Sequence, residues 1–271
     1  MKLGAFTLQN RPWPELVESW RTLDELGLDS IWVADHLASP LRPEAPWFDG
    51  WTCLPALAAV TRRARIGALV SSMTLRTPAV LAKAAVTLDH ISEGRAELAL
   101  GAGGSPRDEE LAGAPPHSFE AFVEKTVDLL GDSALQPRPV QERIPLTIGG
   151  HGETALQLAV RHADRWNSYG GKGLQPEEAL RRGRERNERL TGLCKEAGRD
   201  PLTLVRSILL GHPFVAETPW RSEQAFLEVV ERWSGAGFDE LIVYYPPETG
   251  MPAGTVAPGV FERAVALVRE G

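Results

Sequence analysis

Short apolar segments rich in β-branched residues alternate along this chain with longer segments in which apolar residues recur every three or four positions. The first pattern is typical of buried strands, and the second of helices that cover such strands with one face. The chain contains eight segments of each kind in alternation. We predict strands at Leu3–Phe6, Ser30–Ala34, Ala64–Ser71, Ala96–Leu100, Leu146–Ile148, Arg165–Asn167, Leu204–Gly211 and Glu240–Tyr244. We predict helices at Pro14–Leu26, Thr52–Thr61, Pro78–Ile91, Phe119–Leu130, Glu153–His162, Pro176–Gly198, Ser222–Gly235 and Pro258–Glu270.

The positions of proline and glycine agree with these boundaries. Pro78, Pro176 and Pro258 stand where helices should begin, and glycines such as Gly27 and Gly94 stand where they should end. Eight strands, each followed by a helix, fit a single α/β domain over residues 1–271, a (β/α)8 TIM barrel with loop insertions at the carboxyl ends of its strands. An open, doubly wound sheet is the alternative.

Composition and charge narrow the class of partner. The chain has 271 residues, 43% of them hydrophobic, and its 29 basic and 36 acidic side chains give a net charge of −7. We therefore expect a small-molecule partner rather than nucleic acid or a membrane. The apolar run Leu54–Val60 is too short to span a bilayer and the amino terminus lacks a secretory pattern, so we expect a cytoplasmic protein. Cys53 and Cys194 match no disulfide or metal spacing, which predicts two packed thiols.

Reactive groups of a barrel lie just beyond the carboxyl ends of its strands. Asp35 and His36 follow the second predicted strand. A histidine there can exchange a proton near neutral pH, and the adjacent carboxylate can orient it or raise its pKa. The alternative is a histidine bonded only to backbone groups. Arg76, after the third strand, either binds an anionic ligand group or pairs with a carboxylate of the chain.

Two further strand ends are rich in glycine. The fourth strand is followed by Gly101, Gly103 and Gly104, where a flat ligand or a phosphate can approach the backbone. The fifth is followed by Gly149, Gly150, His151 and Gly152 and then by a helix, whose first amides suit a phosphate ester. A tight turn without a ligand is the alternative at the second site.

Several kinds of catalytic machinery are missing. None of the five lysines stands at a predicted strand end, so a Schiff-base mechanism has no nucleophile. His36, His151 and His212 show no metal-ligand spacing, and we predict no metal site. The sequence contains neither a Gly-x-Ser-x-Gly elbow nor a Walker loop. A phosphorylated cofactor is therefore expected to supply the chemistry.

Seven segments in order between residues 30 and 170 resemble the bacterial luciferase-like family of flavin- and deazaflavin-dependent oxidoreductases. The resemblance rests on Trp51-Thr-Cys-Leu-Pro-Ala-Leu-Ala-Ala-Val-Thr, Arg65-Ile-Gly-Ala-Leu-Val-Ser, Thr74-Leu-Arg-Thr-Pro-Ala-Val-Leu-Ala-Lys, Leu88-Asp-His-Ile-Ser-Glu-Gly-Arg, Leu98-Ala-Leu-Gly-Ala-Gly, Ile148-Gly-Gly-His-Gly and Ala159-Val-Arg-His-Ala-Asp-Arg-Trp-Asn.

The resemblance implies a barrel that binds FMN or the deazaflavin coenzyme F420 at the carboxyl ends of its strands. It implies a non-proline cis peptide at Leu69–Val70, beside Ser71, that backs the ring, and it places Asp35 and His36 near the reactive centre and Gly149 to Gly152 around the phosphate. Two departures stand out. Gly104 occupies a place where some deazaflavin-dependent dehydrogenases carry an acid, and the segment 131–144 is shorter than usual.

The expectation that follows is an F420-dependent oxidoreductase that transfers a hydride to or from a small, largely apolar substrate, with His36 as proton donor or hydrogen-bond partner. An FMN-dependent monooxygenase is the first alternative and a non-catalytic flavin-binding barrel the second. A homodimer is possible because members of this family commonly pair. Candidate walls of the substrate pocket are Trp13, Trp47, Phe48 and Trp51, although tryptophans near loops also serve as lids of the core.

Overall fold

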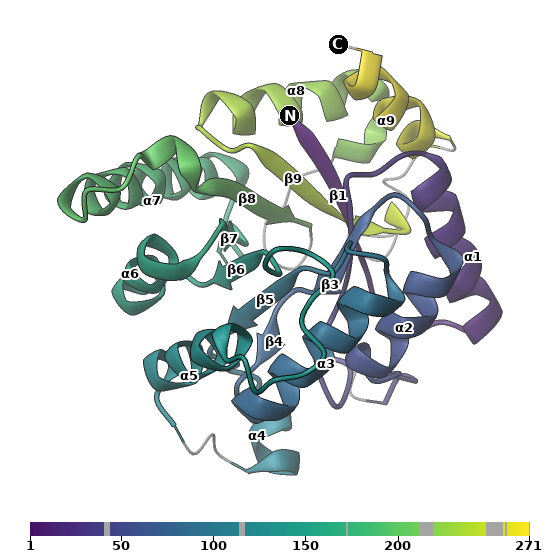
Figure 1. The fold of residues 1–271 in the computed structure, drawn as a ribbon. Coiled ribbons are helices and arrows are strands. Elements are labelled where there is room, and N and C mark those ends of the chain that lie inside the picture. The colour runs from purple at the N-terminus through teal and green to yellow at the C-terminus, as the bar shows by residue number, and fades with distance from the viewer. Residues whose placement is uncertain are drawn as a thin grey trace.

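Nine parallel strands form one sheet that curls into a nearly closed barrel in a computed structural model (Figure 1). The structure describes residues 1–271 except 41–43, 114–116, 172, 212–218, 248–256, 258 and 271. The strands follow one another in space in the order β3-β2-β1-β9-β8-β7-β6-β5-β4, and a backbone bridge between Ile66 and Ala96 links the two sides of the seam. The strands are β1 Lys2–Thr7, β2 Ser30–Val33, β3 Arg65–Ala68, β4 Ser71–Ser72, β5 Leu98–Gly101, β6 Leu146–Gly149, β7 Arg165–Ser168, β8 Val205–Leu210 and β9 Glu240–Tyr245.

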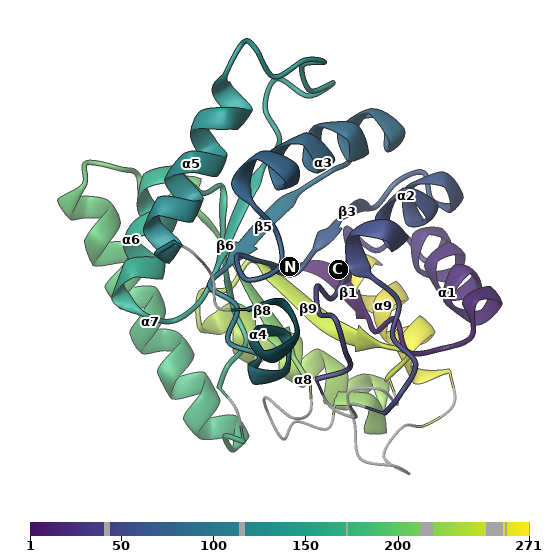
Figure 2. The ribbon, with the colours of Figure 1, turned by 90° about the horizontal axis from the view of Figure 1, so that it is seen from below.

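Helices surround the strands. In the part of the chain that the structure describes they are α1 Trp13–Glu25, α2 Gly50–Val60, α3 Pro78–Ile91, α4 Pro106–Ala112, α5 Phe119–Gly131, α6 Glu153–His162, α7 Pro176–Glu196, α8 Glu223–Gly235 and α9 Val260–Glu270. Short 3-10 turns follow at Pro201–Thr203 and Pro219–Arg221. Seen from below in Figure 2, α4 lies in front of the strands, inside the ring that the larger helices form.

The predicted barrel is confirmed, with two local differences. The expected third strand, Ala64–Ser71, is interrupted at Leu69–Val70 and appears as β3 and β4. Helix α4 was not predicted; it begins after Ser105, whose hydroxyl accepts a hydrogen bond from the amide of Asp108 at 3.3 Å. A serine followed three residues later by an acid is a helix-start pattern, so this signal was present in the sequence. In the segment noted as short, 131–144, Gly131 is the last residue of α5 and the other residues form neither helix nor strand.

The structure also bears on the predictions about thiols, helix starts and membrane segments. Cys53 and Cys194 are buried and unpaired, as predicted. Pro78 and Pro176 begin α3 and α7, whereas Pro258 and His212 lie outside the described residues. No helix in the described ranges is long and apolar enough to cross a membrane.

The inside of the barrel is polar at the amino ends of the strands. Arg165 on β7 lies between Glu97, with Nε 3.3 Å from Oε1, and Glu240, with which it forms an ion pair. Ser30 donates a hydrogen bond to Glu240 and Thr147 donates one to Glu97, each at 2.7 Å. Burial raises the pKa of Glu240, an effect that the Arg165 guanidinium opposes. These paired charged and polar side chains line the interior of the barrel at the amino ends of the strands.

Towards the carboxyl ends the interior becomes apolar. Side chains from β1, β2, β5, β8 and β9 and from the β3–β4 junction pack together there, and we call this set the inner apolar cluster. Its members are Phe6, Leu8, Trp32, Ala34, Leu69, Ala99, Leu209, Ile242 and Tyr244, with Trp47 and Val70 packed against it. A second, larger core lies between the outer face of the strands and the helices.

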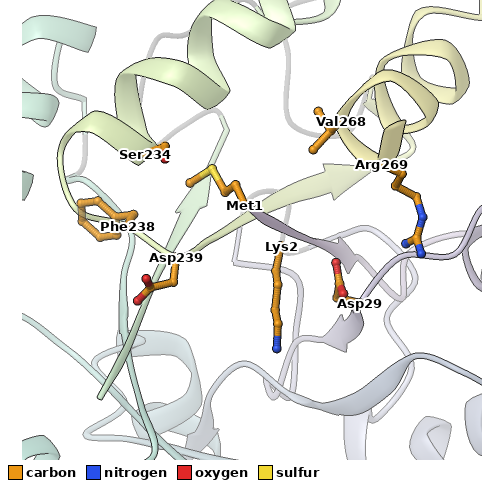
Figure 3. Close-up of a pocket in the computed structure, with 8 residues that line it drawn as sticks. All are labelled: Met1, Lys2, Asp29, Ser234, Phe238, Asp239, Val268 and Arg269. Atoms are coloured by element: carbon orange, nitrogen blue, oxygen red, sulfur yellow. The ribbon is translucent and has the colours of Figure 1, made fainter. Parts of the chain in front are cut away.

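A cavity of about 500 Å³ lies at the opposite, amino end of the barrel (Figure 3). Its two aspartates are already used by the backbone: Asp29 accepts from the amide of Leu3 at 2.9 Å and Asp239 from that of Arg206 at 2.8 Å. Because the reacting groups of barrel enzymes lie at the carboxyl ends of the strands, we do not take this cavity as the site of chemistry.

Candidate active site at the carboxyl ends of the strands

His36 lies just beyond β2 and is held by a carboxylate from α4. Its Nδ1 is 2.6 Å from Oδ2 of Asp108, and the other oxygen of Asp108 accepts from the amide of Leu37 at 2.9 Å. The Asp108 side chain is 3% exposed and the His36 side chain 31% exposed. Because a carboxylate only accepts, we assign the proton to Nδ1, which leaves Nε2 of the neutral ring as the basic atom. The pair can take a proton from a ligand or return one to it.

Sequence reasoning did not find Asp108, and it chose the wrong partner for His36. The carboxylate next to it in sequence, Asp35, is turned away: its oxygens accept from Arg76 at 3.0 Å and from the amide of Ser72 at 3.1 Å. Burial raises the pKa of Asp35, while Arg76 opposes that effect. Arg76 also pairs with Asp49, the N-cap of α2, at 2.7 Å. Of the two alternatives predicted for Arg76, pairing with carboxylates of the chain is therefore confirmed. Asp35 holds in place the segment that follows β4.

The peptide between Leu69 and Val70 is cis, as the family resemblance implied. The side chain of Val70 lies against two of the predicted cofactor-binding glycines. A Cβ at Gly101 would overlap Val70, and one at Gly149 would lie 2.7 Å from its Cγ1. These two glycines therefore make room for the side chain of Val70. This contact was not predicted, and it lets the backbone at both strand ends lie close to Val70.

The other predicted cofactor-binding residues near Val70 are Ser71, Gly103 and Gly104, and they differ in how closely other atoms surround them. The hydroxyl of Ser71 accepts from Nε1 of Trp51 at 3.1 Å. A Cβ at Gly103 would lie 2.7 Å from the hydroxyls of Ser72 and Thr74, whereas nothing lies within 4 Å of one at Gly104. Of these positions only Gly104 is open, and an acid is supplied nearby by Asp108.

The start of α6 has the features of an anion site. Gly152 is its N-cap, and no side chain caps it. The amide of Gly150 donates to the carbonyl of Asn167 at 3.3 Å, but no described residue accepts from the amides of Gly152, Glu153 or Thr154. The carboxylate of Glu153 is paired with Arg189 on α7. Unpartnered amides at the positive end of a helix dipole fit a phosphate group, so this part of the predicted cofactor site suits its ligand.

His151 stands beside these amides as a neutral ring. It stacks on Tyr169 with ring centroids 4.2 Å apart, and its Nε2 lies 3.0 Å from the hydroxyl of Ser168 and accepts from the amide of Tyr169 at 3.4 Å. A backbone N–H only donates, so we assign the proton to Nδ1. Burial, together with the charge of Arg186, lowers the pKa of His151 to about 4.

The four aromatic residues expected to wall the pocket separate into three environments. Trp47 packs against the inner apolar cluster and donates from Nε1 to the carbonyl of His36 at 2.9 Å. Trp13 and Phe48 are both 39% exposed and touch each other edge to face outside the barrel. Trp51, in the first turn of α2, is buried in the outer core, from which its Nε1 reaches the hydroxyl of Ser71. Only Trp47 of the four adjoins His36.

Among the described residues, no three His, Cys, Asp or Glu side chains gather as metal ligands would. The carboxyl end of the barrel thus presents one proton-exchanging pair, one row of amides suited to an anion, and an apolar wall between them.

Comparisons with known proteins identify the family and the fold of the chain. A family model described as luciferase-like monooxygenase matches residues 1–249. An F420-dependent glucose-6-phosphate dehydrogenase of Amycolatopsis mediterranei is 32% identical over 186 residues, which are 59% of this chain and 55% of that protein. The chain thus spans little more than half the length of the curated relatives it matches.

Two solved structures share the whole fold. An F420-dependent secondary alcohol dehydrogenase in complex with an F420-acetone adduct has a TM-score of 0.80 at 17% identity and covers 99% of each chain. The monooxygenase RslO1 from Streptomyces bottropensis has a TM-score of 0.72 at 16% identity, over 100% of this chain and 98% of the other.

The lowered pKa of His151 predicts a loss of stability in acid. Its folded-state pKa of about 4 lies below the ordinary value of 6.5, so between these pH values the unfolded chain binds a proton that the folded chain does not. The stability that the neutral ring contributes is complete above pH 6.5 and is lost as the pH falls towards 4. Each tenfold change in proton affinity is worth about 1.4 kcal/mol, so we expect a loss on the order of 2 to 3 kcal/mol.

Urea unfolding at pH 4.5 and pH 7 measures this loss. We expect His151→Gln to flatten the pH dependence relative to the unmodified chain, whereas His90→Gln, at an exposed histidine on α3, should leave it unchanged. Equal slopes for His151→Gln and the unmodified chain would contradict the prediction.

Proposed function

The chain belongs to the family of luciferase-like monooxygenases, and from that premise we propose that it is an oxidoreductase that binds coenzyme F420 in the mouth of its barrel and transfers a hydride to or from a small, largely apolar substrate. The observation that carries this proposal is the His36–Asp108 pair at the rim. A barrel that only stored a flavin would have no use for a half-exposed imidazole oriented by a buried carboxylate.

The preference for F420 over FMN rests on two supports. Curated relatives that match this chain at 32% and 31% identity are named F420-dependent dehydrogenases. The second support is the buried acid of α4 next to His36, which supplies an acidic group near the glycines after β5 where Gly104 itself has none.

Different parts of the rim would hold different parts of the coenzyme. The free amides of Gly152, Glu153 and Thr154 would bind its phosphate, and the neutral ring of His151 beside them adds a donor at Nδ1 without adding charge. The inner apolar cluster, with Val70 at its edge, would face the ring system. When bound, the deazaflavin supplies a carbon that accepts or donates a hydride.

The chain's own part in the reaction is proton transfer. In oxidation of an alcohol, Nε2 of neutral His36 takes the hydroxyl proton as the hydride leaves carbon; in the reverse direction the protonated ring returns it to oxygen. Asp108 keeps the ring oriented and stabilises the positive charge of its protonated form. Trp47 fixes the backbone of His36 from the other side. Asp35 takes no part in the proton transfer, because its carboxylate already accepts hydrogen bonds from Arg76 and Ser72. Its role is to hold the neighbouring segment in position.

An FMN-dependent monooxygenase is the second candidate, favoured by the full-length likeness to the fold of RslO1. The phosphate site at α6 suits FMN as well as F420, since both carry a phosphate ester. The identity of the coenzyme therefore decides between the two reactions.

The outer surface along α2 and α3 suits contact with a second copy of the chain. Helix α2 contains no charged residue, and its exposed positions are Thr52, Pro55 and Ala59, of which two are apolar. Together with α3 it lines a groove of about 580 Å³, in which Val80 is 60% exposed and Ile91 43% exposed. A largely apolar groove of this kind can be covered by a partner, and a two-fold axis would cover it with its own counterpart. We infer a homodimer through α2 and α3.

Binding of each coenzyme to the purified protein tests the proposed function. We expect F420 to bind with micromolar or lower Kd and FMN with a Kd near millimolar, a difference of about 4 kcal/mol. Quenching of coenzyme fluorescence measures both. The reverse order, together with oxygen consumption in the presence of reduced FMN, would replace the leading proposal by the monooxygenase.

The proposed role of His36 predicts that its replacement lowers kcat but leaves the Kd for F420 nearly unchanged. With a panel of small alcohols and ketones as substrates, His36→Ala should lower kcat by about 100-fold or more, because general acid–base catalysis contributes about that much. The Kd for F420 should stay within about twofold, since the ring does not belong to the phosphate site. His162→Ala is the matched control: His162 also bonds a carboxylate, Glu124, but on the outside of the barrel. Unchanged kcat in His36→Ala removes this residue from the mechanism.

The proposed dimer can be tested with single charges on its surface. Val80→Glu places a carboxylate in the groove and should convert the protein from dimer to monomer in sedimentation at micromolar concentration. Leu202→Glu, at a residue 89% exposed elsewhere, should leave the dimer intact. A monomeric unmodified protein, or a dimer unaffected by Val80→Glu, contradicts the proposal.

A further inference from the structure

Tyr244, on the last strand, lies inside the barrel beneath the proposed coenzyme site. Side chains of β9 alternate, so Ile242 and Tyr244 belong to the inner apolar cluster while Leu241 and Val243 belong to the outer core. The ring of Tyr244 packs edge to face on Phe6 with centroids 5.2 Å apart, and a Cβ at Gly211 would overlap it. Tyr244 is 4% exposed.

The hydroxyl of Tyr244 has no hydrogen-bond partner among the residues that the structure describes. Burial raises the pKa of Tyr244, with no hydrogen bond or charge contributing to the change. The phenol therefore remains a neutral donor at any ordinary pH. Buried phenols usually find a hydrogen-bond partner for the hydroxyl at their polar tip.

The side chains of the inner apolar cluster offer this donor no acceptor. Apart from Tyr244 itself, the only polar side-chain atoms in the inner apolar cluster are the indole nitrogens of Trp32 and Trp47. Both are donors, and both are already used: Trp32 donates to Ser30 at 2.8 Å and Trp47 to the carbonyl of His36 at 2.9 Å. The Tyr244 hydroxyl is thus a donor in an apolar wall that also carries Leu69 and Val70, at the end of the barrel where a ligand enters.

We propose that the Tyr244 hydroxyl is a ligand-binding group that donates a hydrogen bond to a neutral oxygen of the molecule held in the barrel mouth. This inference rests on the proposed function and sharpens it, because it requires a carbonyl or hydroxyl oxygen on an otherwise apolar face of the ligand. Two sources can supply that oxygen: a carbonyl of the deazaflavin ring, or the oxygen of the substrate on which His36 acts.

The test is Tyr244→Phe, which removes the hydroxyl and keeps the ring. Tyr245→Phe is the matched control, because Tyr245 is the next residue on β9 and packs on the outside against Phe261, 4.8 Å away. Three measurements are made on each variant: the urea midpoint without ligand, the Kd for F420, and the Kd of cyclohexanone for the F420 complex, followed by coenzyme fluorescence. Cyclohexane serves as the probe of similar shape that lacks the oxygen.

We expect Tyr244→Phe to leave the urea midpoint equal to or above that of the unmodified chain, because the lost hydroxyl had no partner. Affinity should fall instead, by about threefold to tenfold for one neutral hydrogen bond. A fall in F420 affinity identifies the ring as the source of the oxygen, and a fall in cyclohexanone affinity alone identifies the substrate. Cyclohexane should bind all three proteins equally, and Tyr245→Phe should match the unmodified chain in both affinities.

Two results overturn the inference while the proposed function stands: unchanged affinity for both F420 and cyclohexanone in Tyr244→Phe, or a urea midpoint below that of the unmodified chain with ligand binding intact. An unmodified chain that binds neither F420 nor FMN overturns the proposed function, and this inference with it.

Discussion

The buried ion network around Arg165 is the constraint on which the arrangement of the barrel depends. Arg165 on β7 pairs with Glu97, just before β5, and Glu240 on β9, and those carboxylates accept hydrogen bonds from Thr147 on β6 and Ser30 on β2. Charges withdrawn from water must meet their partners closely or cost several kcal/mol each, so strands that are not neighbours are held in one register. The network also lines the interior at the amino ends of the strands with paired charges, whereas the interior towards the carboxyl ends is apolar.

At that end, single functional side chains depend on contacts between distant segments. His36 is oriented by Asp108, which is 72 positions away, and α4 brings Asp108 there because Ser105 starts that helix in front of the strands. Val70 keeps its place because two strand ends, at Gly101 and Gly149, carry no side chain. The site is thus an outcome of barrel closure, and no segment of the chain contains it alone.

This dependence explains which features the sequence could predict. Strand and helix positions follow from local periodicity, and Gly152 before α6 follows from a local helix-start pattern, so both were found. The partner of His36 was not found, because adjacency in sequence favours Asp35 whereas alternation along the chain turns Asp35 towards Arg76. Gly101 and Gly149 were predicted to leave space for a ligand, but the side chain next to them is Val70, from the junction between β3 and β4, which the barrel brings close to both strand ends. Local patterns locate elements; contacts across the barrel need coordinates.

The distribution of polarity at the mouth restricts the ligand more than its size does. Free amides at α6 favour an anionic group on one side, and the orientation of His36 by Asp108 leaves a basic nitrogen on another. The inner apolar cluster lies between them, and the one hydroxyl that its side chains carry is that of Tyr244. A small polar metabolite would leave most of its hydrogen-bonding groups unpaired against this wall, at about 1 to 3 kcal/mol for each buried group. In the proposed complex the α6 amides would hold the coenzyme's phosphate, and the apolar wall would favour a substrate that carries few polar groups.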